Sequence, residues 1–470
     1  MGDVMHHIRV ALVPAAAISA LIMAWTIVRV TPEWDLEIWI AVLSATLSVF
    51  LAFATTRQVL FVSPQIAFVA MYVILIHVGA IGFYHSDPAD NGRFILLSSL
   101  ALTAFSVPLA YAWILHRSPK PEGGIVNDLV DETEVVWNIF ATVGVLGAFY
   151  YLLRGASATG GLPLLHTFHG FASVRSLAES RLAFATGATG YLYEFYGVIL
   201  PISAVAFMLR WLSTGSRRHR RKALALLGLS AFTLIAAGYR GPVELFLVLV
   251  AIALSYGLGS LRNKTGVAIG VLAAAAFAVL SLGYYSNDSG VSAGQGMMAR
   301  VFEIQADGPQ FVAQSFPSLY PYTDGTSLAH DLEGAFHDHQ AGFSSELPAL
   351  RGAKSLNNPV GAAFDAYANF GPVGLAVVMF SLGLMTLAIH RRLVRERTVS
   401  AIALAAGLSA ALAYGALTGI AGVLLQFGVV TVGLMAVAQS LLRLGRTQQT
   451  INLACQRGDR TNPLPEAGKH

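Results

Sequence analysis

Long uninterrupted runs of apolar residues constrain this chain more than any other feature. They lie near residues 10–30, 36–55, 60–84, 94–115, 135–153, 191–212, 223–239, 242–260, 265–285, 370–390, 398–416 and 421–442. Each run approaches the roughly 20 residues that a helix needs to cross a bilayer. Only 12% of the 470 residues are charged, against about 25% in a typical soluble domain. We predict an all-α polytopic membrane protein, one integral membrane domain over residues 1–470 with about twelve transmembrane helices.

The basic residues predict the orientation of these helices. Of the 30 Lys and Arg, 21 fall in one set of loops and in both termini, and nine fall in the opposite set. Because basic residues are retained on the cytoplasmic side, both termini are expected in the cytoplasm. The basic run at residues 217–222 is interpreted as a topology anchor at that side, with anionic lipid as a further candidate contact.

Two long loops and one tail lie outside the apolar runs. The loops at residues 154–190 and 286–369 are expected to be extracytoplasmic, and residues 443–470 form a cytoplasmic tail. The sequence contains no phosphate-loop, dinucleotide-binding or paired-cysteine zinc motif, and Cys455 is its one cysteine. Any chemistry is therefore expected at the outer membrane surface, without a nucleotide or a nucleic acid.

The turn Gly238-Tyr239-Arg240-Gly241-Pro242 joins two apolar runs with almost no loop. Pro242 suits the first turn of a helix, where its missing N–H costs nothing. Arg240 would then stand beside a helix N-terminus, and the two together form an anion site. The alternative is an arginine that extends to the interface or pairs with Glu244.

Arg175 and Arg181 are two more arginines on the predicted outer side, within the 154–190 loop. If residues 172–184 form a helix, Arg175 and Glu179 are neighbours and can pair. Arg181 lies about 120° around that helix from Arg175, so the two arginines could instead flank one phosphate.

A histidine-rich stretch at residues 330–339 offers proton-transfer or metal-binding groups. His330, Glu333 and His337 share one face if the stretch is helical, and His339 follows closely. Histidine with an ordinary pKa of about 6.5 can accept a proton at neutral pH. Metal ligation, general-base catalysis and a solvated polar loop are all open, and we favour His337 as a base with no metal.

Asp365 and Asn369 stand four residues apart in an apolar stretch that leads into the 370–390 run. An ionisable group at membrane depth is a functional-site hypothesis by default. Gly371 and Pro372 indicate a break in the backbone before the next helix. The alternative is an aspartate that caps a helix or anchors a loop.

These motifs, in this order, resemble the Wzy-type polymerases of O-antigen and related polysaccharides. The resemblance rests on a Gly-Leu-Pro-Leu-Leu loop at residues 161–165 with arginines after it, the Gly238–Gly241 turn, a large outer loop, and Asp-x-Tyr-x-Asn-Phe-Gly-Pro-Val-Gly at residues 365–374. It covers most of the chain in layout but only about 40 residues in motif. The family usually has Glu at the position of Asp365.

The family resemblance implies a GT-C-like fold and a glycosyltransferase of the bacterial inner membrane. Such an enzyme joins polyprenyl-diphosphate-linked oligosaccharide repeats at the outer face, without a cofactor or a metal. Its partners would be that lipid-linked substrate, the bilayer, and in some cases a regulator of chain length.

The residues fit this chemistry in three groups. A diphosphate leaving group needs fixed cations, for which we expect Arg240, Arg175 and Arg181. The attacking sugar hydroxyl needs a base, for which we expect His337, with His330 and Asp365 as alternatives. Tyr367 and Asn369 are expected to contact the acceptor.

Two other functions stay open from the sequence. An O-antigen ligase would use the same donor with a lipid A core acceptor, and the Asn-Phe-Gly stretch favours the polymerase. A transporter or flippase would also have about twelve spans with a basic central loop. Against transport, the two halves show no repeat and the polar clusters gather in the outer loops.

Overall fold

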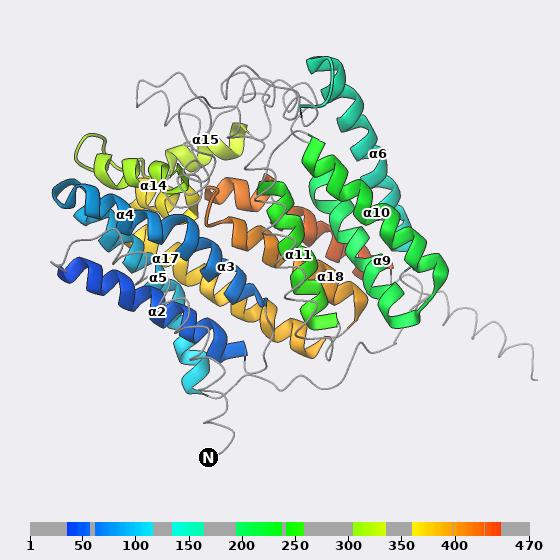
Figure 1. Ribbon diagram of the computed structural model, residues 1–470, viewed down its shortest axis with the longest axis horizontal. Coiled ribbons are helices and arrows are strands. Elements are labelled where there is room, and N and C mark those ends of the chain that lie inside the picture. The colour runs from blue at the N-terminus through cyan, green and yellow to red at the C-terminus, as the bar shows by residue number, and fades with distance from the viewer. Residues whose placement is uncertain are drawn as a thin grey trace, which may run out of the picture.

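A computed structural model describes nine stretches of the chain, and in them every regular element is a helix (Figure 1). The stretches are residues 35–56, 62–115, 134–163, 194–236, 241–257, 304–334, 360–396, 398–426 and 428–442. The α-helices are α2 Leu36–Thr56, α3 Pro64–Tyr72, α4 Val78–Ser86, α5 Pro88–Ile114, α6 Glu134–Thr159, α9 Leu200–Thr214, α10 Arg217–Ala236, α11 Gly241–Gly257, α14 Ile304–Ser315, α15 Thr326–Gly334, α17 Gly361–Arg395 and α18 Val399–Tyr414. Three π-helices join them, namely η1 Val73–His77, η3 Glu194–Ile199 and η4 Gly422–Gln426.

Seven helical segments are long and apolar enough to cross a membrane, so the prediction of a polytopic membrane protein is confirmed. They are Leu36–Thr56, Pro64–Ser86, Pro88–Ile114, Glu134–Thr159, Glu194–Thr214, Gly361–Arg395 and Gly422–Leu442. Two shorter apolar helices, Pro242–Gly257 and Val399–Tyr414, match two further predicted runs. The run near 223–239 lies in α10, and the runs near 10–30 and 265–285 lie outside the described residues, so the count of about twelve stays a prediction.

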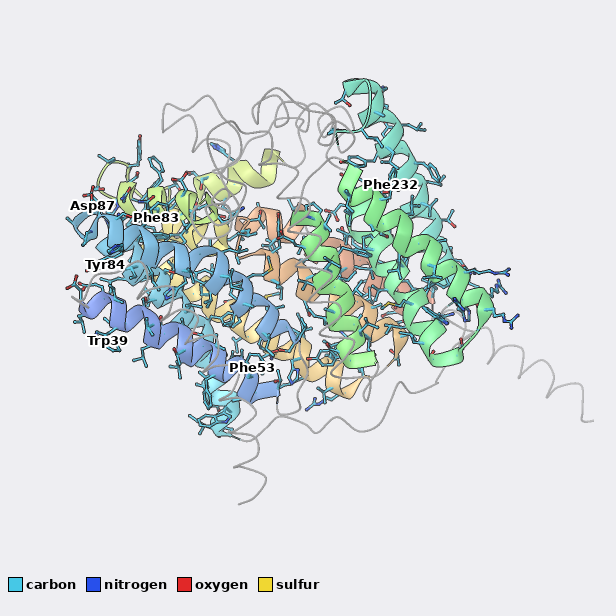
Figure 2. All side chains as sticks on the ribbon, in the orientation of Figure 1. Trp39, Phe53, Phe83, Tyr84, Asp87 and Phe232 are labelled. Carbon is cyan, nitrogen blue, oxygen red and sulfur yellow. The ribbon has the colours of Figure 1, made fainter. Side chains whose placement is uncertain are left out.

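The surface of the bundle carries apolar side chains where a soluble protein would be polar. Along α2, Leu36, Trp39, Leu43 and Leu47 recur at helical spacing and are 72%, 53%, 67% and 44% exposed. Figure 2 shows Trp39 and Phe53 along this helix and Phe232 on α10 across the molecule. A continuous exposed apolar face of this kind fits contact with lipid tails.

Helix α5 lies between α2 and α17, and α18 connects the two halves of the bundle by packing on α3, α9, α11 and α17 (Figure 1). Helix α10 packs along α9. Glycines permit the closest approaches. A Cβ on Gly383 of α17 would lie 2.3 Å from the carbonyl oxygen of Phe105 in α5. Small residues at such crossings let membrane helices gain dispersion contacts that larger side chains would prevent.

The bundle has two ends, which we name after Asn91 and Glu134. At the Asn91 end, the first turn of α5 meets α14, because the Gln310 side-chain amide donates to Asn91 Oδ1 over 2.7 Å. At the Glu134 end, α6 begins beside the start of α18, where Trp137 Nε1 donates to Ser400 Oγ over 3.2 Å. Helix α17 runs between the two ends. We predict that the Asn91 end is extracytoplasmic.

Candidate functional site

The candidate site is built on a break in α17. Gly371 has φ 69° and ψ −162°, so the helical hydrogen-bond ladder is interrupted there, as the glycine and proline predicted. Pro372 has no N–H to offer the carbonyl of Ala368, four residues earlier. That carbonyl instead accepts from the N–H of Thr323 over 3.1 Å, and the carbonyl of Asn369 accepts from Asp324 over 3.0 Å. The break therefore leaves two main-chain carbonyls free to accept hydrogen bonds from Thr323 and Asp324, which lie about 45 residues earlier in the sequence.

The Asn369 side chain is fully buried and reinforces this attachment. Its Oδ1 accepts from the hydroxyls of Thr323 and Ser327 over 2.8 and 2.9 Å. Its Nδ2 donates to the backbone carbonyl and to the side chain of Asp365, over 2.9 and 3.1 Å. Both polar atoms are engaged within the protein, and a contact with an acceptor sugar stays a prediction.

Asp365 lies one turn earlier in α17 and is 1% exposed. Its Oδ2 accepts from the N–H of Ile420 over 2.7 Å, and its Oδ1 accepts from Asn369. Gly419 makes this approach possible, since a Cβ there would stand 2.8 Å from Oδ2. The carboxylate thus satisfies the free N–H at the turn between α18 and η4, which is the anchoring role that the sequence left open.

Tyr367 completes the attachment from the opposite side of the helix. Its hydroxyl donates to the carbonyl of Phe316 over 2.9 Å, and the ring of Tyr322 lies edge-on to it at 5.7 Å. The guanidinium of Arg93, on α5, lies 5.7 Å from the centre of the Tyr367 ring. Arg93 is exposed, and no carboxylate in the described ranges pairs with it, so it adds a cation beside the motif that the sequence analysis did not single out.

Together these contacts fasten residues 316–327, which we call the covering segment, onto the first turns of α17. The covering segment follows α14 directly and includes the first two residues of α15, at the Asn91 end of the bundle (Figure 1). It is thus a folded part of the long loop that was expected over residues 286–369.

The other predicted site residues fall into two groups. His330 is described and lies exposed on α15, just after the covering segment. Arg175, Arg181, Arg240 and His337 lie outside the described residues, so their proposed roles stay predictions. Within the described stretches, no group of three His, Cys, Asp or Glu residues is arranged to hold a metal ion.

Glu194 is a carboxylate that sequence reasoning passed over. It is the first residue of η3 and of the segment Glu194–Thr214, which is long and apolar enough to span a membrane, and its Oε2 accepts a hydrogen bond from the Thr431 hydroxyl. No Lys, Arg or His in the described part of the chain forms an ion pair with it. The signal was present in the sequence, because an acid inside an otherwise apolar run is itself a functional hint.

An apolar pocket opens one turn beyond Glu194. The lining residues on η3 and α9 are Gly197, Val198, Pro201 and Ile202. Leu245, Phe246 and Leu249 of α11 face them, and α18 closes the pocket with Gly407, Ala410 and Ala411. Because Leu245 and Phe246 belong to the first two turns of α11, the N-terminus of that helix lies near the same level as Glu194.

The Glu134 end gathers charges. The Glu134 carboxylate lies 3.1 Å from Lys222 Nζ, 3.6 Å from His219 Nε2, 3.7 Å from an Arg218 nitrogen and 3.9 Å from an Arg210 nitrogen. Lys222 also donates to Asn138 over 2.9 Å. The basic run predicted as a topology anchor therefore ties α10 to α6 and α9 as well.

Comparison with models of known families, with curated proteins and with solved structures finds no significant match.

Proposed function

We propose that this protein is a membrane-embedded glycosyltransferase that polymerises polyprenyl-diphosphate-linked oligosaccharide repeats. In this proposal it has a GT-C-like fold of about twelve spans, lies in the bacterial inner membrane with both termini cytoplasmic, and acts at the outer face. A chain-length regulator is a candidate partner.

The attachment of the covering segment to α17 is the observation that carries this proposal. The stretch with the most specific family resemblance, Tyr367–Gly371, lies where α17 holds the covering segment through Ala368, Asn369 and the nearby Asp365. An enzyme whose donor is anchored by a lipid needs a polar site at such a boundary, where the lipid tail stays in the bilayer and the sugars stay in water. Arg93 supplies an exposed guanidinium beside this stretch, suited to an anionic donor.

The proposed reaction is one displacement. The hydroxyl of an acceptor repeat attacks the anomeric carbon of the growing chain, and polyprenyl diphosphate leaves with the bonding electrons. Arg240, with Arg175 and Arg181, would stabilise the charge that develops on the diphosphate. Asp365 and Asn369 would act by fixing the covering segment over the site, and the sequence favours His337 as the base.

The decisive experiment gives the purified protein polyprenyl-diphosphate-linked repeats and follows the products by gel electrophoresis. A ladder of polymers is expected. Transfer only when a lipid A core acceptor is added would identify a ligase instead. Uptake of the lipid-linked repeat into sealed vesicles, with no new glycosidic bond, would identify a transporter and would contradict the proposed function.

The same assay tests the anion site with Arg240→Ala. Loss of one preorganised donor to developing charge typically lowers a rate by about 10²–10³-fold. Arg240→Lys is expected to recover only part of the rate, because the bidentate fork is lost. Arg154→Ala, which removes an exposed arginine of α6, is the matched control and should retain the wild-type rate. A normal rate in Arg240→Ala at equal expression would remove Arg240 from the site.

A further inference from the structure

The start of α10 carries more positive charge than the described fold balances. Residues 217–222 comprise four arginines, one histidine and one lysine, and three of these six side chains share the Glu134 carboxylate. Arg217 and Arg221 are exposed, and no carboxylate in the described stretches pairs with either of them. Both guanidinium groups are therefore available to an anion that comes from outside the described chain.

The position of these two arginines works against the helix that carries them. Helix α10 begins at Arg217, so both lie in its first two turns, where the positive end of the helix dipole disfavours cations. They are also four residues apart, a spacing at which like charges on a helix repel each other. An anion held between Arg217 and Arg221 would relieve both repulsions.

The face of α10 that carries these arginines continues as an apolar surface. Leu224 and Phe232 are 51% and 47% exposed, and Figure 2 shows Phe232 on this helix. Gly228 lies between them, and a Cβ there would meet nothing within 4 Å. At 3.6 residues per turn, these three residues and the two arginines fall within about 80° of one another. The face therefore has a charged end and an apolar length with an open gap, which suits the headgroup and the acyl chain of a phospholipid.

The start of α10 also lies at the level of lipid headgroups. Helix α10 packs on α9 and α6. Helix α9 ends the apolar segment Glu194–Thr214 and α6 begins another at Glu134, and both segments are long enough to span a membrane. The half-buried ring of Trp211 lies 5.8 Å from the Arg220 guanidinium, and tryptophan is enriched at membrane interfaces. The two arginines thus stand where the phosphates of one leaflet would lie.

We propose that Arg217 and Arg221 bind the phosphate of an anionic phospholipid whose acyl chain lies along α10 over Gly228. A guanidinium presents paired N–H donors that match phosphate oxygens, so two arginines one helical turn apart can hold one headgroup. A soluble polyanion would use the charges alone and leave Leu224 and Phe232 without a partner. The site lies at the Glu134 end of the bundle, away from the covering segment, and it does not depend on the proposed reaction.

The test is native mass spectrometry of the detergent-purified protein with phosphatidylglycerol and with phosphatidylcholine of the same acyl chains. The wild-type protein should prefer phosphatidylglycerol. Each basic residue near an anionic membrane surface contributes about fivefold in affinity, so Arg217→Gln combined with Arg221→Gln should bind phosphatidylglycerol about 30-fold more weakly. Binding of phosphatidylcholine should not change. The matched control combines Arg392→Gln with Arg395→Gln, two exposed arginines in the last turn of α17, and should retain the wild-type affinity.

Three results would overturn the lipid site. Equal binding of phosphatidylglycerol by the wild-type protein and the Arg217/Arg221 double variant would leave the basic run as a topology anchor only. An equal loss in the α17 control would mean diffuse charge attraction without a defined site. Glycerophosphoglycerol is the same headgroup without acyl chains and should compete weakly, so competition as strong as that of the lipid would contradict the apolar half of the site.

Thermal unfolding supplies a second readout that depends on the fold itself. In phosphatidylcholine, the Arg217/Arg221 double variant should unfold at the wild-type temperature or above it, because two repelling cations are removed. Phosphatidylglycerol should raise the midpoint of the wild-type protein and not that of the variant, since a ligand stabilises the state that it binds. A lower midpoint of the variant in phosphatidylcholine would show that the arginines stabilise the fold themselves, contrary to the proposal.

Discussion

The two ends of the bundle use different chemistry to hold their parts together. At the Asn91 end, the covering segment is attached to α17 through hydroxyls, one amide and main-chain groups, around a single buried carboxylate. At the Glu134 end, one carboxylate draws α9 and α10 to α6 through charges. Hydrogen bonds are short-ranged and directional, whereas attraction between separated charges reaches further and is weakened by salt. The first end is built for a defined geometry and the second for association that depends on ionic conditions.

The largest effect is expected from Asp365→Ala, which removes the carboxylate at the Asn91 end. The N–H of Ile420 and the amide of Asn369 would be left buried without this acceptor. Charge-assisted hydrogen bonds contribute about 1.5–3 kcal/mol each, so we expect the free energy of unfolding to fall by about 3 kcal/mol. Thermal unfolding in detergent measures the change. Glu396→Ala, whose partner is the exposed Arg392, is the control and should shift the midpoint little.

A smaller and more local effect is expected from Asn369→Ala. Two hydroxyls of the covering segment lose their shared acceptor, while the main-chain bonds to Thr323 and Asp324 remain. We expect about 1–2 kcal/mol, or roughly tenfold faster amide exchange in residues 316–327. Hydrogen–deuterium exchange mass spectrometry reads this directly. Equal acceleration in α10 would mean that the variant loosens the whole bundle, contrary to the local attachment described here.

The smallest effect should come from Glu134→Gln, and salt should control it. Three cations, Arg210, Arg218 and Lys222, then face a neutral amide, and we expect a loss of about 1 kcal/mol at low ionic strength. The difference from wild type should shrink in 1 M salt, where the screening length is about 3 Å. Asp365→Ala should show no such salt dependence. Unfolding curves of both variants at two salt concentrations test this difference in salt dependence. A loss of stability in Glu134→Gln that does not change with salt would contradict the charge-based attachment at the Glu134 end.

The helices were largely predictable because hydropathy and bilayer thickness fix their length and composition. Their starts were less so. Helix α5 begins at Pro88 and not near residue 94. Its N-cap is Asp87, whose side chain accepts from the N–H of Asp90, a signal that the apolar run did not include. Helix α17 begins at Gly361 and not near residue 370. The sequence suggested that Gly371 and Pro372 separate a loop from a helix, but the residues on both sides of Gly371 are helical.

Three residues of the candidate site in α17 could be named from the sequence, but the groups that they contact could not. Asp365 and Asn369 were named from an acid and an amide four residues apart in an apolar stretch, and Tyr367 from the family resemblance; all three lie in the first turns of α17. Asp365 accepts a hydrogen bond from Ile420, which is 55 residues away in the sequence. This contact depends on how α17 and α18 pack, and a local sequence pattern carries no information about that packing. Glu194 was within reach of the same reasoning as Asp365, since both are acids beside apolar runs.

The break at Gly371 and Pro372 also sets an order of events during synthesis. The covering segment leaves the ribosome before α17. The carbonyl groups of Ala368 and Asn369 that accept from its main chain are held in place only after α17 has formed, with its hydrogen-bond ladder interrupted at Gly371 and Pro372. Long-range pairing of this kind must wait for its partner and for the loop between them to close. The covering segment is therefore among the parts that fold late, after the helix that receives it has entered the bilayer.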